Sequence, residues 1–188
     1  MSLLKNFDYS KFKKDKLPKS NSLETFKEIK QIHRLAENKK FVKDHDDVVK
    51  SFNKVVGDKD SKYIQELIND SAPIILKLKK YYNRPRPKVL ARNFDINLKD
   101  IELASMKTPS YPSGHSTQGY LVAEMLKEKY PKKAQQLDKK AKDISDSRNI
   151  AKAHYKSDST KGKELGLEMA RFIKQQENGW KKTRVERQ

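Results

Sequence analysis

The sequence predicts an all-α fold, a single-domain helical bundle. Apolar residues recur at spacings of three and four along most of the chain, and no stretch alternates apolar and polar residues as a half-buried strand would. Prolines and a glycine fall between the periodic stretches, where helices should end. The 188 residues suit one domain with its own core. We expect a basic N-terminal arm over residues 1–19, a helical domain over 20–176 and a basic C-terminal tail over 177–188.

The first two predicted helices follow the arm. Asn21, with Glu24 three residues on, resembles a capping box, and helical spacing follows at Leu23, Phe26, Ile29, Ile32 and Leu35. A second helix is expected over 42–55, closed by Gly57. The run Asp44-His45-Asp46-Asp47 within it is interpreted as a solvated polar face, because a metal site would need further ligands nearby.

A third helix is expected from Ser61 to about Tyr82. Its apolar stripe consists of Ile64, Leu67, Ile68, Ala72, Ile75 and Leu78. Pro85 and Pro87 should end it, because proline lacks an N–H and restricts the residue before it. Residues 88–110 have no clear period, and an irregular segment of this length is often functional.

Three helices are expected in the second half. One runs from Ser113 to about Tyr130 and stops at Pro131. The next, from about Lys132, carries Ala134, Leu137, Ala141, Ile144, Arg148, Ala151 and Tyr155. The last carries Leu165, Met169, Phe172 and Ile173 before the basic tail around Trp180.

Composition narrows the function classes. The formal net charge of +18 favours anionic partners, namely phosphate esters, nucleic acid or an acidic membrane surface. The absence of cysteine excludes disulfides, a thiol nucleophile and a cysteine–zinc site. No apolar run has the length of a signal peptide core or a transmembrane helix, so we expect a soluble, cytoplasmic protein.

Two stretches carry the chemistry. In Tyr111-Pro112-Ser113-Gly114-His115-Ser116, a turn opens a helix and presents a hydroxyl, a backbone N–H and an imidazole to one point. Helix N-termini attract anions through unpaired N–H groups and the macrodipole. Downstream, Arg148, His154 and Asp158 add a guanidinium, a second imidazole and a carboxylate. These groups could bind a phosphoryl group, attack it and protonate what leaves.

The positions of these residues sharpen the interpretation. Arg148 falls in the apolar seam of its helix and needs an anionic partner there, which could also be a structural Asp or Glu. His154 and Asp158 are four apart and would share one helix face, where the carboxylate would fix the imidazole tautomer. An ordinary surface contact remains the alternative for this pair.

A lysine and two arginines form a candidate anion clamp. Lys79 lies beside the apolar stripe of the third helix, whereas Lys77 points to the opposite side. Arg84 and Arg86 follow on a segment stiffened by two prolines. Arginine suits bidentate phosphate binding, and lysine acts as a point charge.

Together these motifs resemble a known signature. Lys79-x6-Arg86-Pro87, Pro112-Ser113-Gly114-His115 and Ser147-Arg148-x5-His154-x3-Asp158 are similar to the three motifs of the phosphatidic acid phosphatase type 2 / vanadium haloperoxidase superfamily. The likeness is closest to bacterial class A nonspecific acid phosphatases and covers roughly residues 17–175. Lys77-x6-Arg84-Pro85 also fits the first motif, but the helix face favours Lys79. Ala153 stands where the family usually has glycine.

The resemblance implies a helical bundle of that superfamily's type and a role for each residue. His154 would be the nucleophile and form a phosphohistidine, Asp158 would orient it, and His115 would be the general acid and then the base. The phosphoryl oxygens would be held by Lys79, Arg86, Ser113, Gly114 and Arg148, with Arg84 as an auxiliary contact. No metal and no cofactor is implied.

The expected function is therefore that of a metal-independent phosphomonoesterase acting on small anionic phosphoesters. The main alternative is a nucleic-acid-binding or structural protein with a vestigial site, since the basic surface could bind nucleic acid non-specifically. Lesser alternatives are a vanadium-dependent haloperoxidase and a lipid phosphate phosphatase. A homodimer is suggested by the resemblance alone.

Overall fold

The computed structural model describes residues 2–185, with side chains as far as residue 178. The all-α prediction is confirmed: helices, turns and loops account for all of these residues, with no strand among them. The α-helices are α1 (Leu23–His33), α2 (Lys39–Asp44), α3 (Val48–Val56), α4 (Ser61–Tyr82), α5 (Pro87–Ala91), α6 (Gly114–Lys129), α7 (Ala134–Ile150) and α8 (Lys156–Val185). The 3-10 turns are η1 (Ser10–Lys13), η2 (Asp58–Asp60), η3 (Arg92–Phe94), η4 (Ala104–Lys107) and η5 (Pro131–Lys133).

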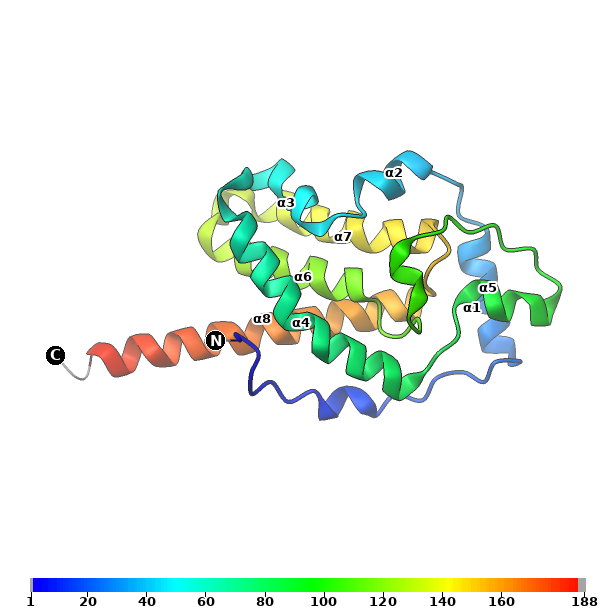
Figure 1. Ribbon diagram of the computed structural model, residues 1–188, viewed down its shortest axis with the longest axis horizontal. Coiled ribbons are helices and arrows are strands. Elements are labelled where there is room, and N and C mark those ends of the chain that lie inside the picture. The colour runs from blue at the N-terminus through cyan, green and yellow to red at the C-terminus, as the bar shows by residue number, and fades with distance from the viewer. Residues whose placement is uncertain (1, 186–188) are drawn as a thin grey trace.

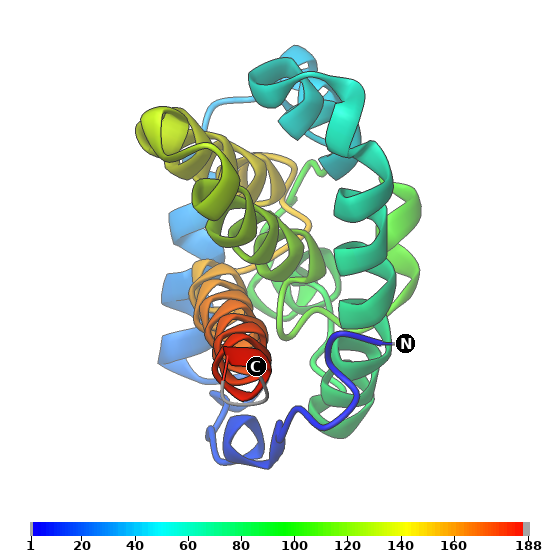
Figure 2. The same cartoon turned by 90° about the vertical axis from the view of Figure 1, so that its left-hand side faces the viewer.

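Helix α6 is the centre of the bundle. It packs mainly against α7 and α8, with α4 on a further side (Figures 1 and 2). The main core lies among these helices and includes Ile64, Leu67, Leu78, Leu121, Leu126, Leu137, Ile144, Leu165 and Met169. The apolar positions predicted for α4, α7 and α8 therefore meet in one core with those of α6.

Two glycines allow α8 to approach α6 closely. A β-carbon placed on Gly162 would lie 2.6 Å from the carbonyl oxygen of Ser113 and 2.8 Å from the β-carbon of Ser116. A β-carbon on Gly166 would collide with the carbonyl of Thr117. The first turns of α6 thus pack backbone-close against α8, which no larger residue would permit.

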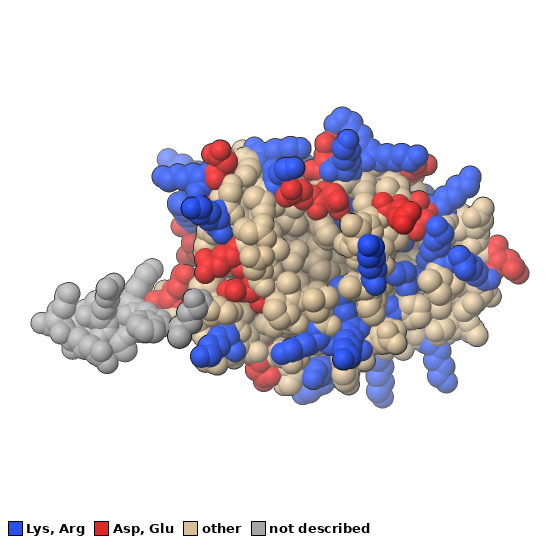
Figure 3. Space-filling view, in the orientation of Figure 1, with Lys and Arg blue, Asp and Glu red and all other residues tan. Residues whose placement is uncertain are grey.

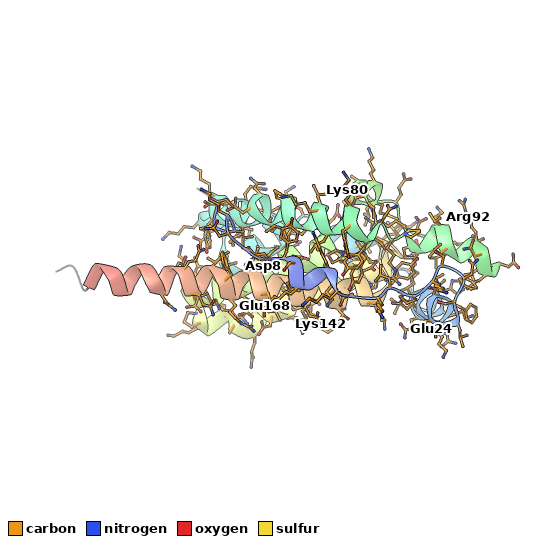
Figure 4. All side chains as sticks on the ribbon, turned by 90° about the horizontal axis from the view of Figure 1, so that it is seen from below. Asp8, Glu24, Lys80, Arg92, Lys142 and Glu168 are labelled. Carbon is orange, nitrogen blue, oxygen red and sulfur yellow. The ribbon has the colours of Figure 1, made fainter. Side chains whose placement is uncertain are left out.

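The N-terminal segment expected as an arm lies along the domain. Its residues Leu4, Phe7 and Phe12 are buried in the main core. Lys11 pairs with Glu168 of α8 at 2.7 Å, where η1 crosses that helix (Figure 4). The lysine-rich composition hid these three apolar anchors, which are too widely spaced to show a helical period.

Two helix predictions in the first half are wrong. The single helix expected over 42–55 is two helices, because Asp47 ends one run and caps the next by accepting the backbone N–H of Lys50 at 2.9 Å. The N-cap of α1 is Ser22 rather than Asn21. The Ser22 backbone is extended, and its hydroxyl accepts the N–H of Thr25 at 3.2 Å.

The second half also differs in detail. Helix α7 ends at Ile150 instead of continuing through Tyr155, and Lys152 takes a left-handed backbone (φ 59°) in the turn before α8. Residues 88–110, expected to be irregular, contain most of α5 together with η3 and η4. Helix α8 runs on to Val185 through part of the expected tail. Residues 186–188, and side chains beyond 178 including Trp180, lie outside the described residues.

The surface carries both signs of charge. On the face drawn in Figure 3, acidic side chains are interspersed among the lysines and arginines. Across residues 2–185 no helix combines the length and apolarity needed to cross a bilayer.

Candidate active site

The candidate residues lie at the ends of four helices that meet on one side of the bundle. Lys79 is in the last turn of α4, Ser113 precedes α6, Arg148 is near the end of α7, and Asp158 is in the first turn of α8. The backbone N–H of Ser113 donates to the carbonyl of Asp158 at 3.0 Å. A β-carbon on Gly114 would lie 4.0 Å from the Cε of Lys79. The structure therefore brings the Ser113 turn, Lys79 and Asp158 together.

The Ser113 turn is a helix N-cap. The Ser113 hydroxyl accepts the backbone N–H of Ser116 at 3.3 Å, and the Thr117 hydroxyl donates to the Ser113 carbonyl at 2.9 Å. Gly114 is the first residue of α6, so its N–H belongs to the unpaired first turn. An anion placed before this helix would meet N–H groups and the positive end of its dipole.

His154 and Asp158 form a buried pair. His154 Nδ1 lies 3.0 Å from Asp158 Oδ2, which also accepts the backbone N–H of Tyr155 at 3.1 Å. An ionised carboxylate can only accept, so Nδ1 carries the proton and Nε2 keeps its lone pair. The pair does not share a helix face as predicted, since His154 lies in the turn before α8. That turn folds the imidazole back onto the first turn of the helix.

Burial sets the protonation of this pair. It lowers the pKa of His154, and the hydrogen bond to Asp158 opposes that effect only in part. For Asp158, burial raises the pKa, but the His154 hydrogen bond and the Arg84 charge together outweigh it and leave the pKa below its ordinary value. At neutral pH the pair is thus a neutral imidazole held by a carboxylate.

Arg84 was expected as an auxiliary contact to the phosphate, but its guanidinium is engaged by two carboxylates. Its NH1 lies 2.7 Å from Asp158 Oδ1, and its NH2 pairs with Glu28 of α1. The guanidinium also stacks 3.8 Å from the centre of the Tyr155 ring. Sequence reasoning missed Glu28, which also accepts from the Ser157 hydroxyl. No spacing signal links Glu28 to residues this far along the chain.

Arg86 and Lys79 are held by backbone carbonyls of the segment before the Ser113 turn. Arg86 donates to the carbonyls of Thr108 at 2.8 Å and Ser105 at 2.9 Å, and Lys79 Nζ donates to that of Pro109 at 2.6 Å. The Arg86 NH1 also lies 3.0 Å from His154 Nε2 and donates to it. The irregular segment thus fixes two cations beside the imidazole.

The cations stand in a cluster of like charge. Burial first, and then the charge of Arg86, lower the pKa of Lys79 to about 7. Burial also lowers the pKa of Arg86 to about 10, so Arg86 stays charged at neutral pH. The charge of Lys79 contributes to the lowered pKa values of both His115 and His154. A dianion would relieve the repulsion within this cluster.

Arg148 and His115 share one partner, Asp46. The fully buried Arg148 donates from NH1 to Asp46 Oδ1 at 2.7 Å, and His115 Nε2 donates to the Asp46 backbone carbonyl at 2.9 Å. Burial and the Arg148 charge lower the pKa of His115 to about 4. Asp46 was interpreted from the sequence as part of a solvated face. Asp46 is exposed, as that interpretation requires, and it also reaches Arg148 of α7. The interpretation is wrong for His45, which is buried.

The arrangement has the parts for acid–base and nucleophilic chemistry on an anion. It holds an imidazole with Nδ1 fixed by Asp158 and an unprotonated Nε2 that accepts from Arg86, a second imidazole and a helix N-terminus, together with the buried cations Lys79, Arg86 and Arg148. Within the described part of the chain, no three histidine, aspartate or glutamate side chains converge as a metal site would require.

Comparison with known proteins supports a relationship to acid phosphatases. The non-specific acid phosphatase of Salmonella typhimurium is 42% identical to this chain over 95 residues, and that of Salmonella typhi is 39% identical over 95 residues. Each match covers 50% of this chain and 38% of the relative, so the chain spans well under half the length of the relatives it matches. No family model matches the chain.

Proposed function

We propose that this protein is a metal-independent phosphomonoesterase that hydrolyses small phosphate esters through a phosphohistidine. One observation carries the proposal. His154 is held at Nδ1 by Asp158 and presents Nε2 to Arg86, beside Lys79 and the Ser113 turn. The matches to non-specific acid phosphatases support the same reaction class.

In the first step, His154 Nε2 attacks phosphorus and the bond to the leaving oxygen breaks. The leaving oxygen takes a proton from His115, and Asp158 stabilises the positive imidazole that forms. Arg86, which donates to Nε2 in the free protein, transfers its hydrogen bond to a phosphoryl oxygen. In the second step, His115 takes a proton from water, which attacks the phosphohistidine and releases inorganic phosphate.

Charge on the phosphoryl oxygens is stabilised by the cluster. Lys79, Arg86 and Arg148 supply positive charge, and the Ser113 hydroxyl and Gly114 N–H complete the set of donors. Buried contacts fix the positions of these groups, so mainly their hydrogen-bond partners change when substrate binds. They take the role that metal ions have in other phosphatases. Membership of the phosphatidic acid phosphatase type 2 / vanadium haloperoxidase superfamily stays a prediction. The alternative functions, namely haloperoxidase, lipid phosphatase and nucleic-acid binding, also stay predictions, as does the homodimer.

A panel of phosphoesters tests the proposal, with His154→Ala as the matched control. Wild-type protein should release phosphate from p-nitrophenyl phosphate and other monoesters, with no loss in EDTA and with inhibition by vanadate. The variant should lose activity by about 10³-fold or more with an unchanged circular dichroism spectrum. Full activity in His154→Ala would remove the nucleophile from this scheme.

A further inference from the structure

Asp46 accepts hydrogen bonds from two groups of the proposed site at once. Its Oδ1 lies 2.7 Å from Arg148 NH1 and 3.7 Å from His115 Nε2, and its backbone carbonyl accepts from the same Nε2 at 2.9 Å. The proposed site needs the guanidinium for a phosphoryl oxygen and the imidazole proton for the leaving oxygen. In the free protein both are engaged by a single residue.

Among the described residues, Arg148 has no second anionic partner. Its remaining contacts are the Ser147 hydroxyl at 3.0 Å and the Val42 carbonyl at 3.4 Å, and Asp46 is its sole carboxylate partner among the described residues. A carboxylate oxygen and a phosphoryl oxygen offer a guanidinium the same kind of acceptor. The Asp46 carboxylate therefore takes the position on Arg148 that a phosphate oxygen would take.

The two partners differ in their freedom to separate. Arg148 is fully buried, whereas the Asp46 side chain is 47% exposed and lies in the short connection between α2 and α3. The Asp46 side chain can rotate into solvent and stay hydrated there, whereas the buried Arg148 guanidinium cannot follow it. A bound phosphate would then receive the guanidinium, while His115 Nε2 keeps its hydrogen bond to the Asp46 backbone carbonyl until the leaving oxygen takes its place.

Resting on the proposed function, we propose that Asp46 is an internal anion that a substrate must displace from Arg148. A dianionic phosphate monoester replaces one negative charge with two and gains attraction from the surrounding cations. A monoanionic phosphate diester replaces one charge with one and gains little.

The test compares Asp46→Asn with Asp47→Asn. The neighbouring aspartate has the same charge and a side chain that is 49% exposed, and asparagine can replace it as the N-cap of α3. Binding of inorganic phosphate and of dimethyl phosphate is measured by calorimetry at one pH and ionic strength. Asp46→Asn should bind both ligands about fivefold more tightly than wild type, because both displace the same carboxylate, whereas Asp47→Asn should stay within about twofold.

Two results would overturn the inference. Unchanged or weaker phosphate binding in Asp46→Asn would make Asp46 a structural partner of Arg148, and equal tightening in Asp47→Asn would reveal a general charge effect. Asp46→Ala repeats the measurement should the amide variant fail to fold. Turnover of p-nitrophenyl phosphate by wild type is scored separately. If it is absent while Asp46→Asn still tightens phosphate binding, the proposed function fails and the anion site stands.

Discussion

Ser113 and Asp158 are joined through their backbones, the N–H of Ser113 donating to the carbonyl of Asp158 at 3.0 Å. The side chain of the same aspartate holds His154. The turn that opens α6 and the imidazole before α8 therefore share one anchor. Any shift of α8 along α6 would move the proposed nucleophile relative to the proposed phosphate site.

Gly162→Ala tests this coupling. The added methyl group would lie 2.6 Å from the Ser113 carbonyl oxygen, so α8 must move away from the turn. We expect a loss of about 1–3 kcal/mol in the free energy of unfolding from overpacking, together with reduced phosphatase activity. Urea unfolding and a kinetic assay measure both. Gly119→Ala is the control, because its methyl group would lie 3.4 Å or more from its neighbours. A Gly162→Ala protein with wild-type stability and rate would contradict the coupling.

Arg84→Met should destabilise the fold strongly. It leaves Asp158 and Glu28 without their shared cation, and breaking a buried ion pair on one side costs about 3–5 kcal/mol. The Asp158 pKa is depressed in the folded protein, so its contribution to stability is present above the unfolded pKa and is lost as pH falls. The difference in the free energy of unfolding between wild type and variant should therefore become smaller in acid.

Urea unfolding at neutral and acidic pH checks the Arg84 prediction. The exposed Arg92, changed to methionine, is the control and should cost little. Adding Glu28→Gln to Arg84→Met should restore part of the loss, because one unpaired charge disappears. A gap of constant size across pH would show that packing of the guanidinium on Tyr155, rather than charge, explains the loss.

Lys79 should make anion binding depend on pH near neutrality. Its pKa of about 7 means that the ammonium is charged below that pH and neutral above it. Sulfate keeps a constant charge over this range, so its affinity should fall as pH rises through about 7. Lys79→Met should bind sulfate weakly, and its sulfate affinity should no longer fall as pH rises through about 7. Lys77→Met is the matched control, because Lys77 is exposed two residues away and should keep the wild-type profile. A step that survived in Lys79→Met would assign the titration to another group.

The rate should be highest in acid. The first step needs a neutral His154 and a protonated His115, and burial lowers the pKa of both. His154 is therefore already neutral in mild acid. His115, with a pKa of about 4, is protonated only at low pH in the free protein. We expect a bell-shaped profile of kcat/KM on the acidic side, with kcat reaching further toward neutrality because bound phosphate raises the His115 pKa.

His115→Asn checks the alkaline limb of that profile. The variant should slow hydrolysis of an alkyl phosphate by about 10²-fold or more, but slow p-nitrophenyl phosphate less, since p-nitrophenolate leaves without a proton. Equal losses on both substrates, or a wild-type rate that kept rising into alkali, would argue against His115 as the acid.

Local patterns predicted much of the fold. The stripe of α4 correctly placed Lys79 against the core and Lys77 in solvent, and the apolar seam of α7 correctly buried Arg148. Periodicity could not find the break between α2 and α3, because Asp47 is an N-cap inside an apparently continuous pattern. It extended α7 too far for a similar reason, since the spacing of Ala151 and Tyr155 fits a helix that the chain leaves at Ile150.

The partners of the site residues were harder to predict than the residues themselves. Arg148 meets Asp46 from 102 positions away, and Arg84 meets Glu28 from 56 positions away. Such pairs depend on how helices cross, which is decided by packing of the whole core. A single sequence shows that a buried arginine needs an anion, but not which carboxylate will supply it.

The contact between Ser157 and Glu28 spans 129 positions. A nascent polypeptide therefore cannot assemble this centre until synthesis has reached the first turn of α8, however early the preceding helices form. During renaturation from urea, recovery of anion binding should coincide with the last structural phase rather than precede it. A protease cut within 88–110 would leave Glu28 and Lys79 on one fragment and His154 on the other.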